Sequence, residues 1–370
     1  MTHARLTPLA AALPSTVPFV GPEEMERQRG APFTARLGAN ENGFGCSPRA
    51  VAAMQAASEE IWKYGDSSSH DLREALAAFW SCRPENIVVG QGIDGLLGDL
   101  VRLTVAPGDS IVTSLGGYPT FNYHVAGYGG TIHTVPYRDD HEDLPALIAR
   151  AAEVDAKLVY FANPDNPMGN YLPGAKVAEA LEALPEGTLL ILDEAYAELA
   201  PEDAATPVAM DDPRVIRMRT FSKGYGMAGA RVGYAIAEAP LIAAFDKVRN
   251  HFGMNRTAQI GALAALQDQD WLAHIRAEVA SARERIGAIA AANGLNALPS
   301  ATNFVAIDCG RDGAHARALV AAFAEEGIFI RMPGVAPLDR CIRISCGPAA
   351  ELDRLEAVFP QVLARVATPA

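Results

Sequence analysis

Seven short, continuously apolar segments lie in the central part of the chain, separated by helical stretches or loops. They occupy residues 87–89, 110–113, 131–135, 158–161, 189–192, 215–218 and 232–236. Half-exposed strands alternate apolar and polar positions, whereas continuous apolar runs indicate strands buried on both faces. The pattern predicts an α/β fold, in which a mostly parallel seven-stranded sheet is flanked by helices. Ligands of such sheets bind at the carboxyl ends of the strands.

Helical patterns precede and follow these strands. Helices are expected at 48–62 and 72–80, and Ser68 and Asp71 have the spacing of a capping box before the second. A long amphipathic helix carries an apolar stripe from Trp271 to Ile289 and ends at Asn293-Gly294. The rest of the chain predicts a small α+β lobe, with strands at 303–307, 328–331 and 341–345 and helices at 314–326 and 352–363.

This division predicts three parts. Residues 1–39 are rich in proline and irregular apart from a short helical piece at 22–28, so we expect an N-terminal arm that joins the small domain and any subunit contact. Residues 40–260 are expected to form the large domain. Residues 261–370 are expected to form the small C-terminal domain, with the long amphipathic helix as the hinge.

Composition narrows the functional classes. The 370 residues are 49% hydrophobic and 20% charged, which is ordinary for a globular protein. A net charge of −13 argues against a nucleic-acid or anionic-membrane surface but permits a local positive pocket. We find no apolar run near the ~20 residues of a membrane span and no signal-peptide core at the start. The five scattered cysteines indicate a reduced, cytoplasmic protein, and Cys341 and Cys346 make a poor metal pair, so no metal is expected.

The strand at 215–218 leads into the stretch with the most distinctive chemistry. A lone lysine, Lys223, follows the hydroxyl residues Thr220 and Ser222, and Arg231 comes after a run of small residues. An ammonium at the end of a core strand shifts its pKa and becomes a candidate Schiff-base nucleophile. Hydroxyls and arginine are phosphate-binding types. A lysine beside a phosphate site suggests pyridoxal phosphate, whose aldehyde forms an imine with lysine. The alternative is a loop lysine and a surface arginine.

A second candidate stretch ends the strand at 189–192. Asp193 would face the ligand crevice and pair with a pyridine nitrogen, whereas Glu194 would point to the other face. Tyr196 could donate a hydrogen bond to the ring oxygen. A helix N-cap is the alternative role for Asp193.

Three further loops follow strands. Asn166 lies on a tight turn between two prolines and Gly169, where its amide could reach a ligand. The glycine-rich residues 90–95 open a helix, so the backbone amides of Gly92, Ile93 and Asp94 could bind a phosphate. These glycines also match the dinucleotide fingerprint, but the next strand has no acid at its end, which favours a single phosphate. Phe121 is the candidate for stacking on a pyridine ring, while Tyr118 is assigned to the core.

Together these motifs resemble those of fold-type-I pyridoxal-phosphate aminotransferases, and within them the histidinol-phosphate aminotransferase family. The resemblance runs from about Phe19 to the last helix. It is carried by Asn-Pro-Asp-Asn-Pro-Met-Gly at 163–169, Asp-Glu-Ala-Tyr at 193–196 and Thr-Phe-Ser-Lys-Gly-Tyr-Gly at 220–226 with its continuation to Tyr234.

The resemblance implies roles for individual residues. Lys223 would bind the coenzyme covalently and move a proton, Asp193 would hold the pyridine nitrogen, and Asn166 and Tyr196 would contact the ring oxygen. The remaining roles are phosphate binding by Ile93, Asp94, Ser222 and Arg231, ring stacking by Phe121, and substrate contact by Asn42, Asn255, Arg331 and Arg343. Tyr64 would reach the phosphate of a neighbouring subunit's cofactor, which implies a homodimer with shared active sites.

The chain departs from the family pattern in its N-terminal arm. Phe19 replaces a tyrosine whose hydroxyl meets the substrate phosphate, Gly43 and Phe44 follow Asn42 in place of Pro-Leu, and Met168 replaces threonine. The leading hypothesis is a histidinol-phosphate aminotransferase-like enzyme of amino-acid biosynthesis, which transfers an amino group between an amino acid or amino-phosphate substrate and 2-oxoglutarate. Alternatives are an aromatic amino acid aminotransferase, a decarboxylase of the threonine-phosphate type and, remotely, a nicotinamide-dependent dehydrogenase.

Overall fold

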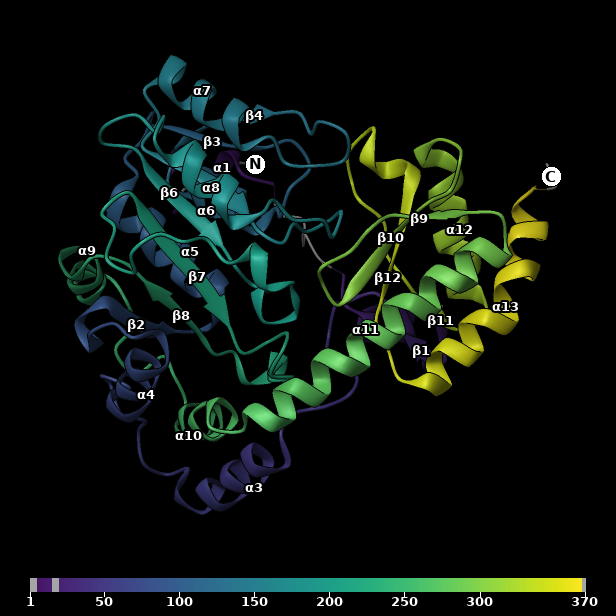
Figure 1. The fold of residues 1–370 in the computed structure, drawn as a ribbon, viewed down its shortest axis with the longest axis horizontal. Coiled ribbons are helices and arrows are strands. Elements are labelled where there is room, and N and C mark those ends of the chain that lie inside the picture. The colour runs from purple at the N-terminus through teal and green to yellow at the C-terminus, as the bar shows by residue number, and fades with distance from the viewer. Residues whose placement is uncertain (1–4, 15–19, 368–370) are drawn as a thin grey trace.

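The computed structural model describes residues 5–14 and 20–367, which form two lobes joined by a long helix (Figure 1). The larger lobe contains a seven-stranded sheet with helices on both sides. The smaller lobe lies at the other end of helix α11 (Gln269–Ala292), which runs from the large lobe along the small one. The seam between the lobes lies beside the ends of the strands.

The large sheet confirms the predicted architecture. Its strands are β2 (Ile87–Gly90), β3 (Ser110–Ser114), β4 (Thr131–Val135), β5 (Leu158–Ala162), β6 (Leu189–Asp193), β7 (Val215–Thr220) and β8 (Gly233–Ile236). They are ordered β2-β8-β7-β6-β5-β3-β4, and in this sheet β8 alone runs in the direction opposite to the other strands. Strands β6 and β7 extend into polar residues because Asp193 still pairs with Met218 and Thr220 with Gly233.

Both faces of this sheet are covered, as the continuous apolar runs indicated. Along β5, Leu158 and Tyr160 pack with α5 (Gly92–Thr104) and α6 (Thr120–Gly127). The alternate residues Val159 and Phe161 pack with α7 (Leu144–Val154) and α8 (Gly174–Leu181) on the other side. Successive side chains of a strand point to opposite faces of the sheet, so each strand contributes to two separate apolar cores.

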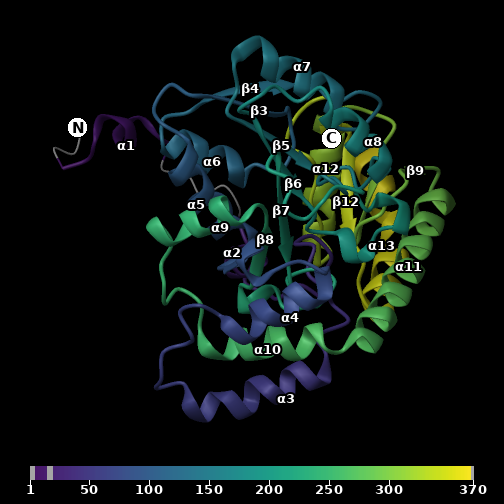
Figure 2. The ribbon, with the colours of Figure 1, turned by 60° about the vertical axis from the view of Figure 1, so that its left-hand side comes forward.

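Helices α3 (Pro48–Ala57), α4 (His70–Trp80) and α10 (Arg256–Leu266) pack together at one end of the large lobe (Figure 2). The expected helix 48–62 is shorter, because a 3₁₀ turn at Ser58–Glu60 follows α3. The capping box before α4 is also wrong. The Asp66 carboxylate accepts hydrogen bonds from the backbone amides of Ser68 and His70, and the residue before the helix, Ser69, has a positive φ of 48°.

The small lobe is built on β10 (Phe304–Asp308), which pairs antiparallel with β12 (Cys341–Ser345) and β9 (Asn296–Ala297). Helices α11, α12 (Gly313–Glu325) and α13 (Ala349–Ala367) cover it. A strand of the arm, β1 (Ala35–Arg36), pairs parallel with β11 (Ile328–Phe329), which is shorter than the expected 328–331.

The rest of the arm contributes α1 (Pro8–Ala12) and α2 (Pro22–Arg29), and α9 (Ala239–Ala244) follows the large sheet. Ala35 and Leu37 are buried in the apolar core of the small lobe. The domain boundaries at residues 39 and 260 stay predictions.

Across the described ranges 5–14 and 20–367, no helix has the length and apolar character needed to cross a membrane. The same residues contain no group of three or more His, Cys, Asp or Glu side chains placed to hold a metal ion.

Candidate active site

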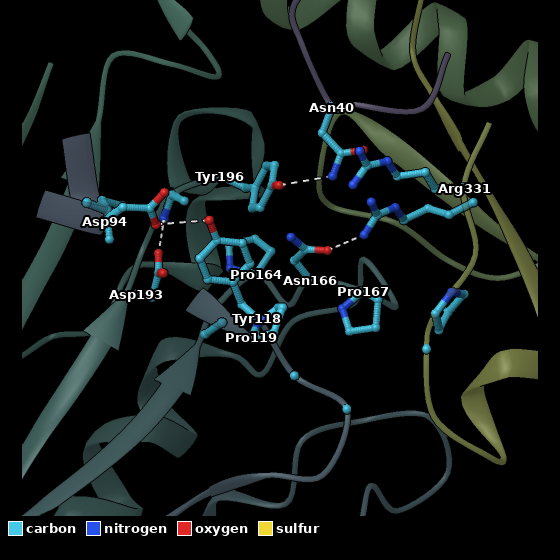
Figure 3. A pocket seen from close by; sticks show the side chains of 18 of the residues that line it. Asn40, Asp94, Tyr118, Pro119, Pro164, Asn166, Pro167, Asp193, Tyr196 and Arg331 are labelled. Atoms are coloured by element: carbon cyan, nitrogen blue, oxygen red, sulfur yellow. Dashed lines mark hydrogen bonds between the residues drawn. The ribbon is translucent and has the colours of Figure 1, made fainter. Parts of the chain in front are cut away.

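A cavity of about 750 Å³ opens at the carboxyl ends of the large-sheet strands and is closed on one side by the small lobe. Most of the candidate residues line it: Ile93, Asp94, Asn166, Asp193, Tyr196, Thr220, Ser222, Lys223, Arg231, Arg331 and Arg343. Figure 3 shows Asp94 and Asp193 at one end of the cavity and Arg331 at the other. The tertiary structure therefore joins motifs that are far apart in sequence.

Lys223 follows β7 and lies in the wall of the cavity. Its Nζ donates a hydrogen bond to the backbone carbonyl of Asn40 at 2.9 Å. Burial, reinforced by the positive charge of Arg343, lowers the pKa of Lys223 to about 8. About a tenth of this amine is thus uncharged at pH 7. The uncharged amine is the form that attacks a carbonyl carbon.

Asp193 ends β6 and is almost fully buried. The Tyr160 hydroxyl donates to its Oδ2 at 2.5 Å, and the Ala195 amide donates to its Oδ1 at 3.0 Å. Burial raises the pKa of Asp193 to about 6, and these donors oppose that shift. Glu194 points to the opposite face, as expected, where it pairs with Arg217 and Arg219 at 2.8 and 3.0 Å.

A cradle of donors forms between α5 and the loop after β7. Arg231 Nη1 donates to Ser222 Oγ at 3.3 Å, and Thr220 Oγ1 donates to the same oxygen at 2.9 Å. Gly92 is not itself in the cavity wall. It has a positive φ of 74°, and a Cβ at this position would collide with the guanidinium of Arg231. Gly92 thus permits Arg231 to lie against the N-terminus of α5, where amides attract anions.

Phe121, the residue chosen for ring stacking, does not line the cavity, whereas Tyr118, Tyr160 and Tyr196 do. Phe121 is fully buried in the core, stacked on Tyr160 with ring centroids 4.9 Å apart. Tyr118 lines the cavity and donates its hydroxyl to Asp94 Oδ1 at 2.9 Å (Figure 3). Tyr118 and Phe121 are only three residues apart, and the first turn of α6 buries Phe121 in the core while Tyr118 faces the cavity.

Asn40 is a cavity residue that the sequence reasoning missed. Its Nδ2 donates to the Tyr196 hydroxyl at 3.2 Å, and its side-chain oxygen accepts from Ser345 Oγ at 3.0 Å. Burial raises the pKa of Tyr196 to about 12, so this phenol keeps a proton to donate. The positive φ of 53° at Asn40 is a left-handed conformation that asparagine tolerates, and the nearby polar loop was the available signal.

Asn42, the residue chosen from the same loop, does not line the cavity. Its Nδ2 donates to the carbonyls of Lys223 and Gly224 at 3.1 and 3.2 Å, so it holds the lysine loop. Asn255 also lies outside, because its side chain caps the start of α10 by accepting from the Ala258 amide.

Two arginines form the opposite end of the cavity. Arg331 and Arg343 face each other across an isolated antiparallel bridge, with the Arg343 amide 2.6 Å from the Arg331 carbonyl. Arg343 Nη1 donates to the side-chain oxygen of Asn166, and Arg331 Nη2 donates to the Val20 carbonyl at 2.7 Å. Burial lowers the pKa of Arg343 to about 10, and its Nε is buried with no hydrogen-bond partner.

Tyr64 does not line the cavity of this single chain either. Tyr64 is 80% exposed and packs on Phe252, with ring centroids 4.9 Å apart. Phe19 lies outside the described residues.

The donor set fits a coenzyme with one phosphate, one aldehyde and one basic ring nitrogen. The Ser222–Arg231 cradle suits a phosphate, Lys223 suits an aldehyde, and the buried Asp193 carboxylate suits a protonated nitrogen. The two arginines at the far end suit an anionic substrate group.

Comparison with known proteins gives a consistent result. Residues 34–359 match the family model for aminotransferase class I and II. A histidinol-phosphate aminotransferase of Anaeromyxobacter sp. (strain Fw109-5) is 36% identical over 96% of this chain and 98% of its own length. Another, from Haloferax volcanii, is 33% identical over 95% and 96%. The crystal structure of histidinol-phosphate aminotransferase from Sinorhizobium meliloti in complex with pyridoxal-5'-phosphate is 55% identical, with a TM-score of 0.95 over 98% of this chain and 99% of that one.

Proposed function

The chain belongs to the class I and II aminotransferases, and from this membership we propose that it transfers an amino group from histidinol phosphate to a keto acid. Pyridoxal 5'-phosphate is the cofactor, and 2-oxoglutarate is the proposed acceptor. The similarity to relatives named histidinol-phosphate aminotransferase supports this assignment.

The observation that carries the substrate proposal is the pair Arg331 and Arg343. Residues opposite each other in an antiparallel bridge project to the same side, which supports one anionic site shared by the two guanidinium groups. Both line the cavity that contains Lys223. A doubly charged phosphate, or the distal carboxylate of glutamate, matches two arginines better than an uncharged amine does.

The roles of the protein groups follow from their positions. The bound coenzyme supplies an electron sink for the bond-breaking step. With the coenzyme bound, the Lys223 amine, held by the Asn40 carbonyl, would accept the proton of the substrate Cα and would return it in the second half of the transfer. Asp193 would keep a proton on the ring nitrogen, and Ser222 and Arg231 would hold the phosphate. Tyr118 covers the ring in place of Phe121.

A variant pair checks the assignment of the covering ring. Replacing Tyr118 by leucine should weaken coenzyme binding by roughly three- to tenfold through lost stacking. Phe121→Leu should leave coenzyme affinity unchanged and lower the thermal stability instead. Equal loss of affinity in both variants, measured by coenzyme titration, would remove Tyr118 from this role.

We further propose a homodimer in which Tyr64 reaches the partner's coenzyme phosphate. The exposure of this ring, and of its neighbours Ile61, Trp62 and Phe252, supports an apolar surface that a second copy covers. Light scattering should give twice the mass of the chain. Tyr64→Phe should weaken coenzyme binding without changing that mass. The cytoplasmic location stays a prediction.

The amino donor is tested by a half-reaction screen. The enzyme with bound coenzyme is mixed with histidinol phosphate, phenylalanine, tyrosine and threonine phosphate, and the rate at which the visible band bleaches is measured for each. Fastest bleaching by histidinol phosphate is expected, whereas faster bleaching by an aromatic amino acid would overturn the substrate proposal. Release of CO₂ from any donor would favour the decarboxylase alternative.

A further inference from the structure

Next to the cavity lies a buried pair of carboxyl groups that the proposed reaction does not use. Glu142 precedes α7, and Asp165 follows β5 in the loop that carries Asn166. Their exposed fractions are 7% and 1%. The two carboxyl groups are hydrogen-bond partners of each other.

Each carboxyl group also has donors of its own. Ser114 Oγ donates to Glu142 Oε2 at 2.7 Å, and the Ala162 amide donates to Glu142 Oε1 at 3.4 Å. For Asp165, the donors are the Tyr137 hydroxyl at 2.8 Å to Oδ1 and the Met168 amide at 2.9 Å to Oδ2.

An ionised carboxylate has no hydrogen to donate, so two ionised groups cannot form the contact between them. Two like charges this close and this deeply buried would also repel each other strongly. One proton between the two groups satisfies the contact and leaves a single charge.

We propose that Glu142 and Asp165 share one proton, which is held mainly on Glu142. The two are positioning residues, because the single negative charge that remains on the pair lies next to Asn166 and Arg343. The pair lies next to the substrate-binding end of the cavity, because Asp165 directly precedes the cavity residue Asn166 in sequence. Asn166 in turn accepts a hydrogen bond from Arg343.

The donors decide which group holds the proton. Burial and the neighbouring Asp165 raise the pKa of Glu142 well above its ordinary value. Burial also raises the pKa of Asp165, but Glu142, the Met168 amide and the Tyr137 hydroxyl oppose that rise, as does the positive charge of Arg343. The negative charge is therefore better accommodated on Asp165.

The titratable groups that face the pair come from four other segments. Tyr137 and Tyr160 stand near the pair, and burial raises the pKa of each far above its ordinary value. Tyr196 is protonated as well, with a pKa of about 12. Arg343 is the positive group that interacts with Asp165. Below pH 10, these phenols stay neutral and the pair itself sets the charge seen by Arg343.

Losing the shared proton would add a second negative charge beside Arg343. The arginine would then attract a substrate anion less strongly, because part of its field is compensated. The pair therefore links the protonation of a buried site to the affinity for the anionic substrate. The proposed effect on substrate affinity rests on the proposed function and the role it gives to Arg343. The existence of the shared proton does not depend on either.

Infrared difference spectroscopy tests for the proton directly. The spectrum of the coenzyme-bound wild type at pH 7, minus that of Glu142→Gln, should contain the carbonyl stretch of a buried carboxylic acid. Asp165→Asn should lose the same band, because its amide N–H replaces the shared proton and Glu142 then ionises. The exposed Glu153→Gln serves as control and should keep the band. A wild type without the band, or a band that persists in both amide variants, would overturn the shared proton.

The pH dependence of stability gives a second readout that needs no substrate. Glu142 binds its proton in the folded protein above pH 4.5, its ordinary pKa, but has lost it in the unfolded chain. The proton bound only in the folded protein stabilises it less as the pH rises. In the wild type, this factor in the folding equilibrium constant should fall tenfold per pH unit from about pH 5 up to the raised pKa of Glu142 in the folded protein. Glu142→Gln should lack this contribution, and equal pH slopes in the two proteins would contradict the proposal.

The effect on substrate affinity is tested with the KM for the best anionic substrate as a function of pH. In the wild type, the rise of KM at alkaline pH should begin at lower pH than in Glu142→Gln and reach about tenfold, the effect of one added charge near Arg343. The variant should show the later rise caused by Arg343 itself. Identical onsets would reject the link to Arg343. If no amino donor reacts, the result counts against the proposed aminotransferase substrates. The infrared band would still show whether the shared proton exists.

Discussion

The two ends of the cavity differ in how the chain builds them. The coenzyme end, with Lys223, Asp193 and Ser222, comes from residues that directly follow the central strands of one sheet. The substrate end comes from the small lobe, where Arg331 and Arg343 meet across a bridge, and from the distant loop at Asn40. Neighbouring parallel strands position the first set with little freedom, whereas the second depends on how two lobes pack.

This difference separates chemistry from selectivity. Residues at strand ends are held by the backbone ladder, so the reacting groups are preorganised. Residues from the second lobe approach the same cavity from another core, so they can change the substrate without disturbing the coenzyme. Variants at the coenzyme end should therefore lose turnover, whereas variants at the substrate end should mainly raise KM.

The largest effect is expected at Lys223. Lys223→Ala removes the amine that we propose binds the coenzyme and moves the proton, and transamination should fall by roughly 10⁴-fold or more. Turnover and the visible band, with its loss on borohydride treatment, measure this. Lys247→Ala, an exposed lysine, should behave like the wild type. Turnover of Lys223→Ala within tenfold of the wild type would refute the assignment of this end of the cavity.

The adjacent acids Asp193 and Glu194, which point to opposite sides at the end of β6, provide the next contrast. Asp193→Asn should lower kcat by roughly 10²- to 10³-fold while coenzyme stays bound, because the amide cannot stabilise a protonated ring nitrogen. Glu194→Gln should instead destabilise folding by about 3 kcal/mol, since two buried arginines lose part of their counter-charge. Steady-state kinetics and thermal unfolding separate the two effects, and a reversed pattern would show that the faces are assigned wrongly.

At the substrate end the loss should appear in KM. Arg343→Ala should raise KM for an acidic substrate by roughly 10- to 100-fold with a smaller change in kcat, because it removes a charge-assisted contact. Arg331→Ala should act in the same direction, and the surface variant Arg365→Ala is the control. An unchanged KM in Arg343→Ala would place the substrate anion elsewhere.

The smallest expected effect is a pH dependence of coenzyme capture by the coenzyme-free protein. Attack on the aldehyde requires the neutral amine, and Lys223 has a pKa of about 8 in its buried position. The neutral fraction, and with it the capture rate followed by absorbance, should rise about fivefold between pH 7 and pH 8. A rate that still increases tenfold per unit up to pH 10 would indicate an exposed, unshifted lysine.

Much of the fold could be predicted because burial on both faces leaves a direct trace in sequence. All seven strands of the large sheet were found from apolar runs, with end errors of one or two residues at polar positions such as Asp193 and Thr220. The errors were local: the helix from Pro48 ended early, and the start of α4 was capped by Asp66 from an earlier turn. Hydrogen bonds made by side chains across a loop leave no periodic pattern.

The site was predicted unevenly for the same reason. Lys223, Asp193 and Asn166 follow strands, so their direction could be inferred from the sheet. Phe121 and Tyr118 share a loop and a first helical turn, and composition alone could not tell which ring enters the core. Asn40 and Asn42 are two residues apart, and only the left-handed backbone at Asn40 sends one to the cavity and the other to the lysine loop.

The sequence by itself determined the sheet, the order of its strands along the chain and the chemical identity of the reactive groups, because these depend on local patterns of burial and on residue type. Tertiary structure alone decided which ring and which asparagine face the cavity, that two arginines converge on one site, and that Glu142 and Asp165 meet. Those contacts join segments that are up to 305 residues apart in sequence, such as Asn40 and Ser345. Their geometry is set by the packing of two cores against each other, which no short stretch of sequence encodes.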